Sequence, residues 1–262
     1  MNNQRPSFLR NTPPVVLNLI IINLIIWVAS VTLSNKTAVN LTDLLGMHYF
    51  MSEKFRLYQL FTYMFLHDTS SIWHLFCNMF GVYMFGCALE QVWGSRKFLF
   101  YYMVSGVGAA IVQQLCWTID YWSLTEAMNA AIAQGSAEML GGVEAELRHY
   151  FRFGALDSLT GYDVARMKTM LLDLPTTIGA SGALFGVLLA FGWLFPDVKM
   201  FLLFVPIPIP ARIFVGIYAV AELFLGIADF RFDSVAHFAH LGGMIFGLLL
   251  LLYWRKKGKL FF

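Results

Sequence analysis

Two residues of this sequence, Ser181 and His240, are of the types that together perform nucleophilic catalysis. Ser181 stands in the run TIGASGALFG from Thr177 to Gly186, and His240 stands in the run AHLGGMIFG. A histidine within hydrogen-bonding reach of a serine can take the hydroxyl proton and activate Oγ as a nucleophile. This chemistry requires the two runs, which are far apart in the chain, to meet in the fold.

A second pair, His74 and Asn78, has the spacing of neighbours on one helical face. An imidazole N–H and an amide N–H are suitable donors for the oxyanion of a tetrahedral intermediate in acyl transfer. The alternative for this pair is a polar clasp between helices, without a chemical role. Only the shared depth of these residues with Ser181 and His240, argued below, favours catalysis.

The elements that must position these residues are membrane spans. Of the 262 residues, 58% are hydrophobic and 13% are charged, whereas soluble domains carry about 25% charged residues. A transmembrane helix needs roughly 20 consecutive apolar residues and satisfies its own backbone hydrogen bonds. The sequence predicts six such spans: Val15–Leu33, Thr69–Leu89, Phe98–Ile119, Leu174–Pro196, a weaker one at Ile213–Ala228, and Ser234–Trp254.

The positions of His74, Ser181 and His240 within their spans predict a common depth. Each lies five to seven residues from the start of an even-numbered span, which corresponds to about 8 to 10 Å at 1.5 Å per residue. The even-numbered spans all run in the same direction, so the three residues lie at one level. Ionisable groups inside spans are costly and usually functional.

Paired glycines predict that the fourth and sixth spans pack closely. Gly182 and Gly186 form one G-x-x-x-G pair and Gly243 and Gly247 form the other, each next to one member of the Ser181 and His240 pair. Close packing there would bring serine and histidine together. The alternative is that the small residues serve packing alone and that the Ser181 hydroxyl bonds back to a backbone carbonyl.

The distribution of basic residues predicts the orientation, because cytoplasmic loops are enriched in Lys and Arg. With both termini inside, the cytoplasmic side receives ten of the 18 basic residues on short segments: Arg5, Arg10, Arg96, Lys97, Lys199, Arg212, Arg255, Lys256, Lys257 and Lys259. We therefore expect a cytoplasmic segment at residues 1–14, a membrane domain at 15–254 and a basic cytoplasmic tail at 255–262. The expected location is a bacterial cell (inner) membrane.

A helical insert is predicted between the third and fourth spans on the extracytoplasmic side. Residues 120–173 contain eight of the sixteen acidic residues. Ser123 and Glu126 have the spacing of a capping box, which predicts the start of a first helix. An amphipathic stripe predicts a second helix and consists of Val143, Leu147, Tyr150 and Phe151. A third helix is expected from about Tyr162 to Leu172. These stripes are more typical of packing or of the headgroup layer than of chemistry.

Taken together, these motifs resemble those of the rhomboid family of intramembrane serine proteases. The G-x-S-G pattern is present at Gly179 to Gly182, the A-H-x-x-G-x-x-x-G pattern at Ala239 to Gly247, and the H-x-x-x-N pattern at His74 to Asn78, while Glu90 matches a glutamate near the cytoplasmic end of the second span. The resemblance implies an all-α, polytopic bundle of six transmembrane helices. It also implies a catalytic dyad of Ser181 and His240 without an aspartate, supported by Gly179 and Gly182. His74, Asn78 and the Ser181 backbone N–H would form the oxyanion hole. The insert departs from the family pattern, and it could guide, restrict or cover the substrate's path.

His237 also follows an alanine. The motif requires a glycine three positions after its histidine, but the residue three positions after His237 is His240. We interpret His237 as a neighbour that assists hydration or hydrogen bonding, or as polar packing. Glu90 is expected to organise the end of its span, and Glu222 to face the bundle interior or a partner; neither is assigned to catalysis.

The predicted function is hydrolysis of peptide bonds in or near transmembrane helices of membrane-protein substrates. The expected partners are these substrates and the lipid bilayer, and no cofactor or metal is expected. Cys77, Cys87 and Cys116 lie in predicted spans without metal-ligand spacing, and the net charge of +2 gives no support for nucleic-acid binding. The first alternative is a catalytically silent rhomboid-like protein that binds transmembrane clients. A transporter is the third alternative. Transporters usually show repeat symmetry or further charged residues within their spans, and this sequence lacks both. The physiological substrate and the oligomeric state are not predicted.

Overall fold

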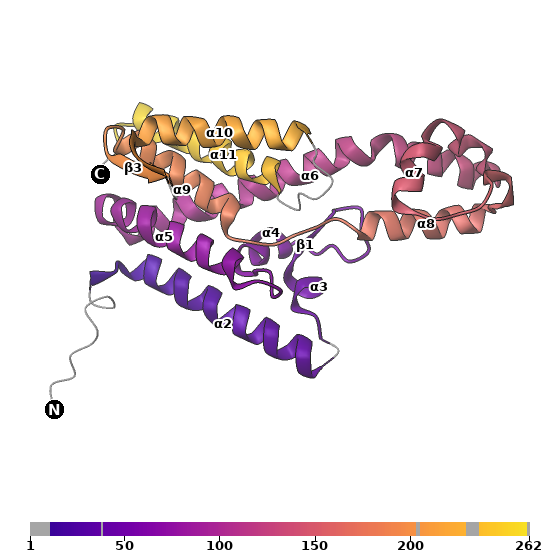
Figure 1. Cartoon of the computed structure of the whole chain (residues 1–262), viewed down its shortest axis with the longest axis horizontal. Coiled ribbons are helices and arrows are strands. Elements are labelled where there is room, and N and C mark those ends of the chain that lie inside the picture. Colours follow the sequence, from indigo (N-terminus) through magenta and orange to yellow (C-terminus); the bar gives the residue numbers. More distant parts are fainter. Residues whose placement is uncertain (1–10, 38, 203–204, 229–235, 261–262) are drawn as a thin grey trace. The chain divides into compact units, whose positions relative to one another are not determined.

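The computed structural model (Figure 1) describes residues 11–37, 39–202, 205–228 and 236–260. The basic residues Arg5 and Arg10 and the predicted start of the sixth span at Ser234 lie outside the described residues. The chain divides into two compact units. Unit 1 comprises Met1–Gly46, Leu60–Gln113 and Ile178–Phe262, and unit 2 comprises Met47–Gln59 and Gln114–Thr177. Each is described by itself.

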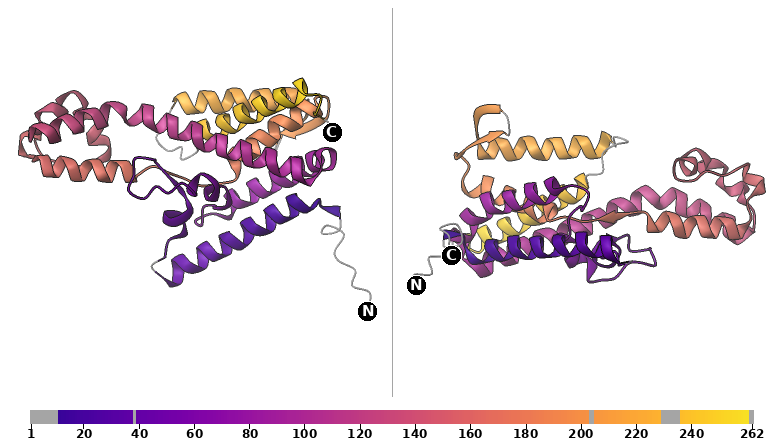
Figure 2. Two further views of the ribbon diagram at one scale, coloured as in Figure 1. Left: turned by 180° about the vertical axis from the view of Figure 1, so that it is seen from behind. Right: turned by 60° about the horizontal axis from the view of Figure 1, so that its bottom comes forward.

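Long apolar helices dominate unit 1. They are α2 (Pro14–Lys36), α5 (Ile72–Trp93), the first part of α6 (Ser95–Gln134), α10 (Ala211–Ala228) and α11 (His237–Lys256), with a shorter apolar helix α9 (Ser181–Leu194). The connections contain α3 (Leu41–Leu45), α4 (Gln59–Thr62), the 3₁₀ helix η1 (Tyr63–Phe65) and a hairpin of β3 (Lys199–Leu202) and β4 (Val205–Pro210). Helix α2 lies along α5 (Figures 1 and 2), and α11 packs against both α9 and α10, which also contact each other.

The chain is a polytopic helical membrane protein. Among the described residues, α2, α5, α6, α10 and α11 are each long and apolar enough to cross a bilayer. Their outward faces carry large apolar side chains such as Ile25, Phe224 and Leu249, each more than half exposed, as expected for surfaces that contact lipid. At 14 residues, α9 is about 21 Å long, less than a hydrocarbon core of about 30 Å. The count of six spans stays a prediction.

Glu90, near the end of α5, joins the ends of three helices. Its carboxylate accepts hydrogen bonds from the backbone N–H groups of Val15 and Val16 at 2.9 and 2.8 Å and from Ser95 Oγ at 2.6 Å. The side chain is buried. It therefore satisfies two N–H groups that the first turn of α2 cannot satisfy internally, as well as the hydroxyl at the start of α6.

The fourth predicted span was wrong in its first part, because residues 174–180 are not helical. Pro175 lacks the N–H that a helix requires, and the next two residues form strand β2 (Thr176–Thr177) in unit 2, antiparallel to β1 (Met47–His48). Gly179 then has φ of +125°, a region that L side chains rarely adopt. Helix α9 consequently begins at Ser181, so the depth of Ser181 does not follow from helical rise.

Unit 2 has its own hydrophobic core. The elements are β1, the C-terminal part of α6, the 3₁₀ helix η2 (Ala137–Val143), α7 (Glu144–Tyr150), the 3₁₀ helix η3 (Leu156–Ser158), α8 (Gly161–Asp173) and β2. Met128, Leu140, Leu147 and Val164 are fully buried together, so η2, α7 and α8 each contribute to one core with α6. A capping box of Thr160 and Asp163 starts α8.

The predicted helix start at Ser123 was wrong. Helix α6 continues without interruption from Ser95 to Gln134. Neither glycine nor proline occurs between Ala109 and Gln134, and the helix ends where Gly135 adopts φ of +68°, a common helix termination. Ser123 and Glu126 therefore lie inside a helix and do not cap the start of one.

Candidate active site

Ser181 lies at the first residue of α9, directly after the turn at Gly179. Its Oγ lies 2.8 Å from Nε2 of His240, which α11 contributes. This is a short hydrogen-bonding distance for an oxygen and a nitrogen. His240 is buried, whereas Ser181 is half-buried. The structure thus brings together the two residues whose types predicted nucleophilic chemistry.

The glycine pairs on α9 and α11 allow this contact. A Cβ added at Gly243 would overlap the carbonyl oxygen of Gly182, and one added at Gly186 would lie 2.9 Å from the carbonyl oxygen of Gly243. Real Cβ atoms essentially never approach within 3.0 Å. The close packing of α9 and α11 that the two G-x-x-x-G pairs predicted is therefore confirmed.

An aromatic ring fixes the plane of the His240 imidazole. Phe185, one turn after Ser181 on α9, stacks on His240 with ring centroids 4.1 Å apart and an interplanar angle of 7°. Rotation of the imidazole about its Cβ–Cγ bond would break this stack. Both the serine and the ring that orients its partner therefore come from the same helix.

His74 approaches the same place from α5. A Cβ added at Gly179 would lie 3.0 Å from His74 Nε2 and 3.5 Å from Ser181 Oγ, so these two groups flank one backbone position. His74 Nδ1 accepts a hydrogen bond from the backbone N–H of Asp68 at 3.3 Å. In a neutral ring with Nδ1 as the acceptor, Nε2 carries the proton. His74 therefore presents an N–H donor beside the serine.

Asn78 lies one turn further along α5 and is buried. Its Nδ2 donates to the backbone carbonyl of His74 at 2.8 Å, and its Oδ1 has no partner among the described residues. This hydrogen bond lies within one helix, so it does not form the interhelical clasp considered as the alternative. One N–H of the amide is already engaged.

His67 adds a second imidazole next to His74. The two ring centroids lie 5.1 Å apart. Burial, together with the neighbouring His74, lowers the pKa of His67 to about 3. His67 is therefore neutral at physiological pH, and both of its ring nitrogens lack partners among the described residues.

The expectation that Glu222 faces the bundle interior or a partner agrees with its burial, but its contact with two imidazoles was not predicted. This residue of α10 directs Oε2 at Nδ1 of His240, 2.9 Å away, and at Nδ1 of His237, 2.6 Å away. His237 thus lies beside the predicted pair but contacts the carboxylate rather than Ser181. The signal that could have found this arrangement is the single carboxylate inside an apolar span, which requires a buried polar partner.

Glu222, His237 and His240 are also the described residues whose donor atoms lie close enough together to consider a metal ion, all within 4.8 Å. Ligand atoms of a tetrahedral zinc ion, each about 2.0 to 2.1 Å from the metal, lie roughly 3.3 Å from one another. The separations of 2.6 and 2.9 Å between the carboxylate and the two imidazoles are hydrogen-bond distances instead. The donor set suits zinc, but its present spacing does not.

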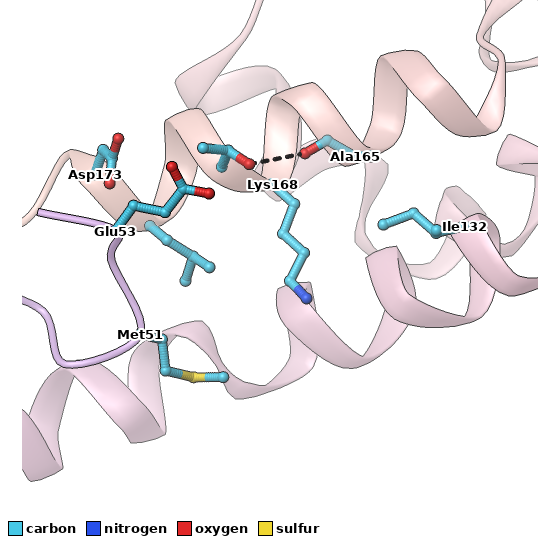
Figure 3. Close-up of a pocket in the computed structure, with 8 residues that line it drawn as sticks. Met51, Glu53, Ile132, Ala165, Lys168 and Asp173 are labelled. Atoms are coloured by element: carbon cyan, nitrogen blue, oxygen red, sulfur yellow. Dashed lines mark hydrogen bonds between the residues drawn. The ribbon is translucent and has the colours of Figure 1, made fainter.

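A separate cavity of about 270 Å³ lies in unit 2 (Figure 3). Lys168 extends from α8 into it, and Glu53 and Asp173 lie at one side of its lining. The Lys168 ammonium donates to Asn129 Oδ1. None of the residues with the predicted chemistry lines this cavity.

The fold and these residues define the class, a multi-pass helical membrane protein with a serine and a histidine in contact. Residues 54–121 and 127–257 match the Rhomboid domain. The chain is also 30% identical over 177 residues to "Rhomboid protein 1, mitochondrial" of Saccharomyces cerevisiae, a match that covers 68% of this chain and 36% of that protein. The chain belongs to the rhomboid family, and its matched part spans about a third of the length of this relative.

Proposed function

We propose that this chain is an intramembrane serine endopeptidase that hydrolyses peptide bonds in or near transmembrane helices of membrane-protein substrates. The observation that carries the proposal is the 2.8 Å contact between Ser181 Oγ and His240 Nε2. Family membership supports the same class of function. A protein that only binds transmembrane clients would need neither the contact nor the stacked Phe185 that orients it.

The reaction follows from the positions of these groups. His240 Nε2 takes the proton as Ser181 Oγ attacks the substrate's peptide carbonyl carbon, and it then returns the proton to the leaving amine. The N–H at His74 Nε2, the Asn78 amide and the Ser181 backbone N–H are the donors proposed for the oxyanion. Water then attacks the acyl enzyme and regenerates Ser181.

The proposed substrates are transmembrane helices that unwind easily. A protease binds extended backbone, and exposing N–H and C=O groups to hydrocarbon costs several kcal/mol for each group. Glycine and proline weaken a helix by roughly 1 and 3 kcal/mol relative to alanine. We therefore expect substrates with small or helix-breaking residues near the helix end that enters the site.

Labelling by a fluorophosphonate tests the nucleophile without a known substrate. The purified protein should be labelled, and both Ser181→Ala and His240→Ala should abolish labelling and the cleavage of a reference transmembrane substrate. Their losses should not add, because the two residues act as one unit. Substantial cleavage by purified Ser181→Ala, with contaminating proteases excluded, contradicts the proposal.

We further propose that both termini are cytoplasmic, that the protein resides in a bacterial inner membrane, and that residues 120–173 lie on the opposite side. Single cysteines replacing Glu138 or Lys259, in a background without the three native cysteines, test the orientation. On intact cells, an impermeant maleimide should modify position 138 and leave position 259 unmodified. The reverse pattern would invert the proposed topology.

A further inference from the structure

We infer that Glu222 is a positioning residue for the proposed catalytic pair, so that Ser181, His240 and Glu222 form a hydrogen-bonded relay. The inference rests on the proposed protease function and extends it beyond a two-residue dyad. The observation that supports the inference is that the two ring nitrogens of His240 face Ser181 and Glu222. Nε2 of His240 lies 2.8 Å from Ser181 Oγ, and Nδ1 lies 2.9 Å from Glu222 Oε2.

The carboxylate selects the tautomer of His240. An ionised carboxylate only accepts hydrogen bonds, so the Nδ1 that faces it must carry the proton. In the neutral ring, Nε2 is then the acceptor, and the Ser181 hydroxyl donates to it. This is the protonation state that a general base needs before it receives the serine proton.

His237 holds the carboxylate in place. It precedes His240 by three residues on α11, so both imidazoles face α10, and its Nδ1 lies 2.6 Å from the same Oε2 atom. The Glu222 side chain is only 11% exposed, and those of His237 and His240 are 8% and 9% exposed. Two N–H donors therefore orient one buried carboxylate oxygen, and this accounts for a carboxylate inside an apolar helix.

Glu222 also acts when the proton moves. When Ser181 attacks the substrate carbonyl, its proton passes to Nε2 and His240 becomes a cation with protons on both nitrogens. The proton on Nδ1 stays on Nδ1, and Glu222 stays ionised next to the new positive charge. Electrostatic interactions of this kind are strong where water is excluded.

The test compares Glu222→Gln with the parent, because glutamine keeps the size and removes the charge. We expect kcat for a reference transmembrane substrate, normalised to folded protein, to fall by at least 10-fold, up to about 10⁴-fold as for an uncharged amide in a serine-protease triad. KM should change less than threefold, since Glu222 does not contact substrate. A fall in kcat of less than 10-fold, or an equal effect on KM, overturns the inference.

Glu90→Gln is the matched control. It makes the same chemical change at a buried glutamate whose partners are the ends of α2 and α6. This variant should be less stable but should keep kcat within threefold when normalised to folded protein. A comparable loss of kcat in Glu90→Gln would show that any buried carboxylate matters through folding, and it would overturn the specific role of Glu222.

A measurement of the tautomer separates this inference from the proposed function. In protein labelled with ¹⁵N-histidine, His240, assigned by comparison with His240→Gln, should show a protonated Nδ1 and an unprotonated Nε2, and this pattern should be lost in Glu222→Gln. A parent protein with this tautomer but without Ser181-dependent labelling refutes the protease function and leaves only the finding that Glu222 sets the tautomer of His240. Protonation at Nε2 in the active parent overturns the positioning role alone. Loss of parent activity in a zinc chelator, with recovery on added zinc, would make the cluster a metal site and overturn it as well.

Discussion

Replacing Gly243 by alanine tests whether the close approach of α9 and α11 sets the serine and histidine geometry. The added methyl group would overlap the carbonyl oxygen of Gly182 and would lie 2.8 Å from its carbonyl carbon. Both contacts are to backbone, which cannot turn away as a flexible side chain can. The two helices must therefore move apart or rotate.

The magnitude follows from these contacts. Ordinary van der Waals contact for a Cβ begins near 3.4 Å, and the carbonyl oxygen of Gly182, the nearer of the two atoms, lies well inside that distance. The backbones must therefore separate by more than about 1 Å, an overpacking that costs about 1 to 3 kcal/mol of stability. Ser181 directly precedes Gly182 and His240 lies one turn before Gly243, so the same movement lengthens their 2.8 Å contact. A misplacement of 1 Å can cost about 10²-fold in rate, and we expect at least about 10-fold here.

The assay measures kcat on a reference transmembrane substrate and the rate of fluorophosphonate labelling, with unfolding in micelles as the measure of stability. Gly216→Ala on α10 is the control, because a Cβ there meets nothing within 4 Å. The control should retain parental activity. If Gly243→Ala is as stable and as fast as the parent, the packing of the two helices does not set the geometry of the site and the reasoning fails.

The remaining predictions concern the other groups around the site. His74→Ala should lower kcat by about 10²- to 10³-fold with little change in KM, as for loss of an oxyanion donor. Asn78→Ala should lower kcat less, because one amide N–H already binds a backbone carbonyl. Parental rates for both variants and for the double variant would contradict the oxyanion-binding role. His67 has a pKa of about 3 in the folded protein and about 6.5 in the unfolded chain. Between these two pH values the unfolded chain binds more protons than the folded protein. The free energy of unfolding therefore falls as the pH drops below about 6.5, by up to about 1.4 kcal/mol per pH unit. His67→Phe should flatten that dependence in pH-dependent unfolding curves, and an unchanged slope would refute it. Glu90→Ala should lower the free energy of unfolding by about 2 to 4 kcal/mol, measured with denaturant, because one buried and one partly buried N–H group lose their acceptor. Ser95→Ala should lower it less, and equal effects would contradict this account.

The sequence predicts the long helices well, because each apolar run must satisfy its backbone internally. The predicted bounds of the first, second and fifth spans lie close to those of α2, α5 and α10. The glycine pairs likewise predict which two helices approach each other. These features depend on local composition and on periodicity, which a sequence displays directly.

Two features depend on residues far apart in the chain, and the sequence does not display them. Helix α9 starts late because Thr176 and Thr177 pair with His48 and Met47, about 130 positions earlier. The contact of Glu222 with His240 depends on the rotation of α10 about its axis, which an apolar sequence does not specify. A buried carboxylate predicts that a partner exists but not which imidazole it is.

The late start of α9 has a chemical consequence for the proposed reaction. The first N–H groups of a helix lack partners within it, and the helix dipole places partial positive charge at that end. An uninterrupted helix from Leu174 would have placed Ser181 in its interior, with its backbone N–H bonded to the carbonyl of residue 177. Because the chain turns at Gly179 instead, Ser181 begins the helix, and its hydroxyl flanks the same backbone position as Nε2 of His74. The departure from regular helix that the sequence analysis missed is therefore the feature that favours negative charge next to the serine. The tetrahedral intermediate of the proposed hydrolysis develops a negative charge at that point.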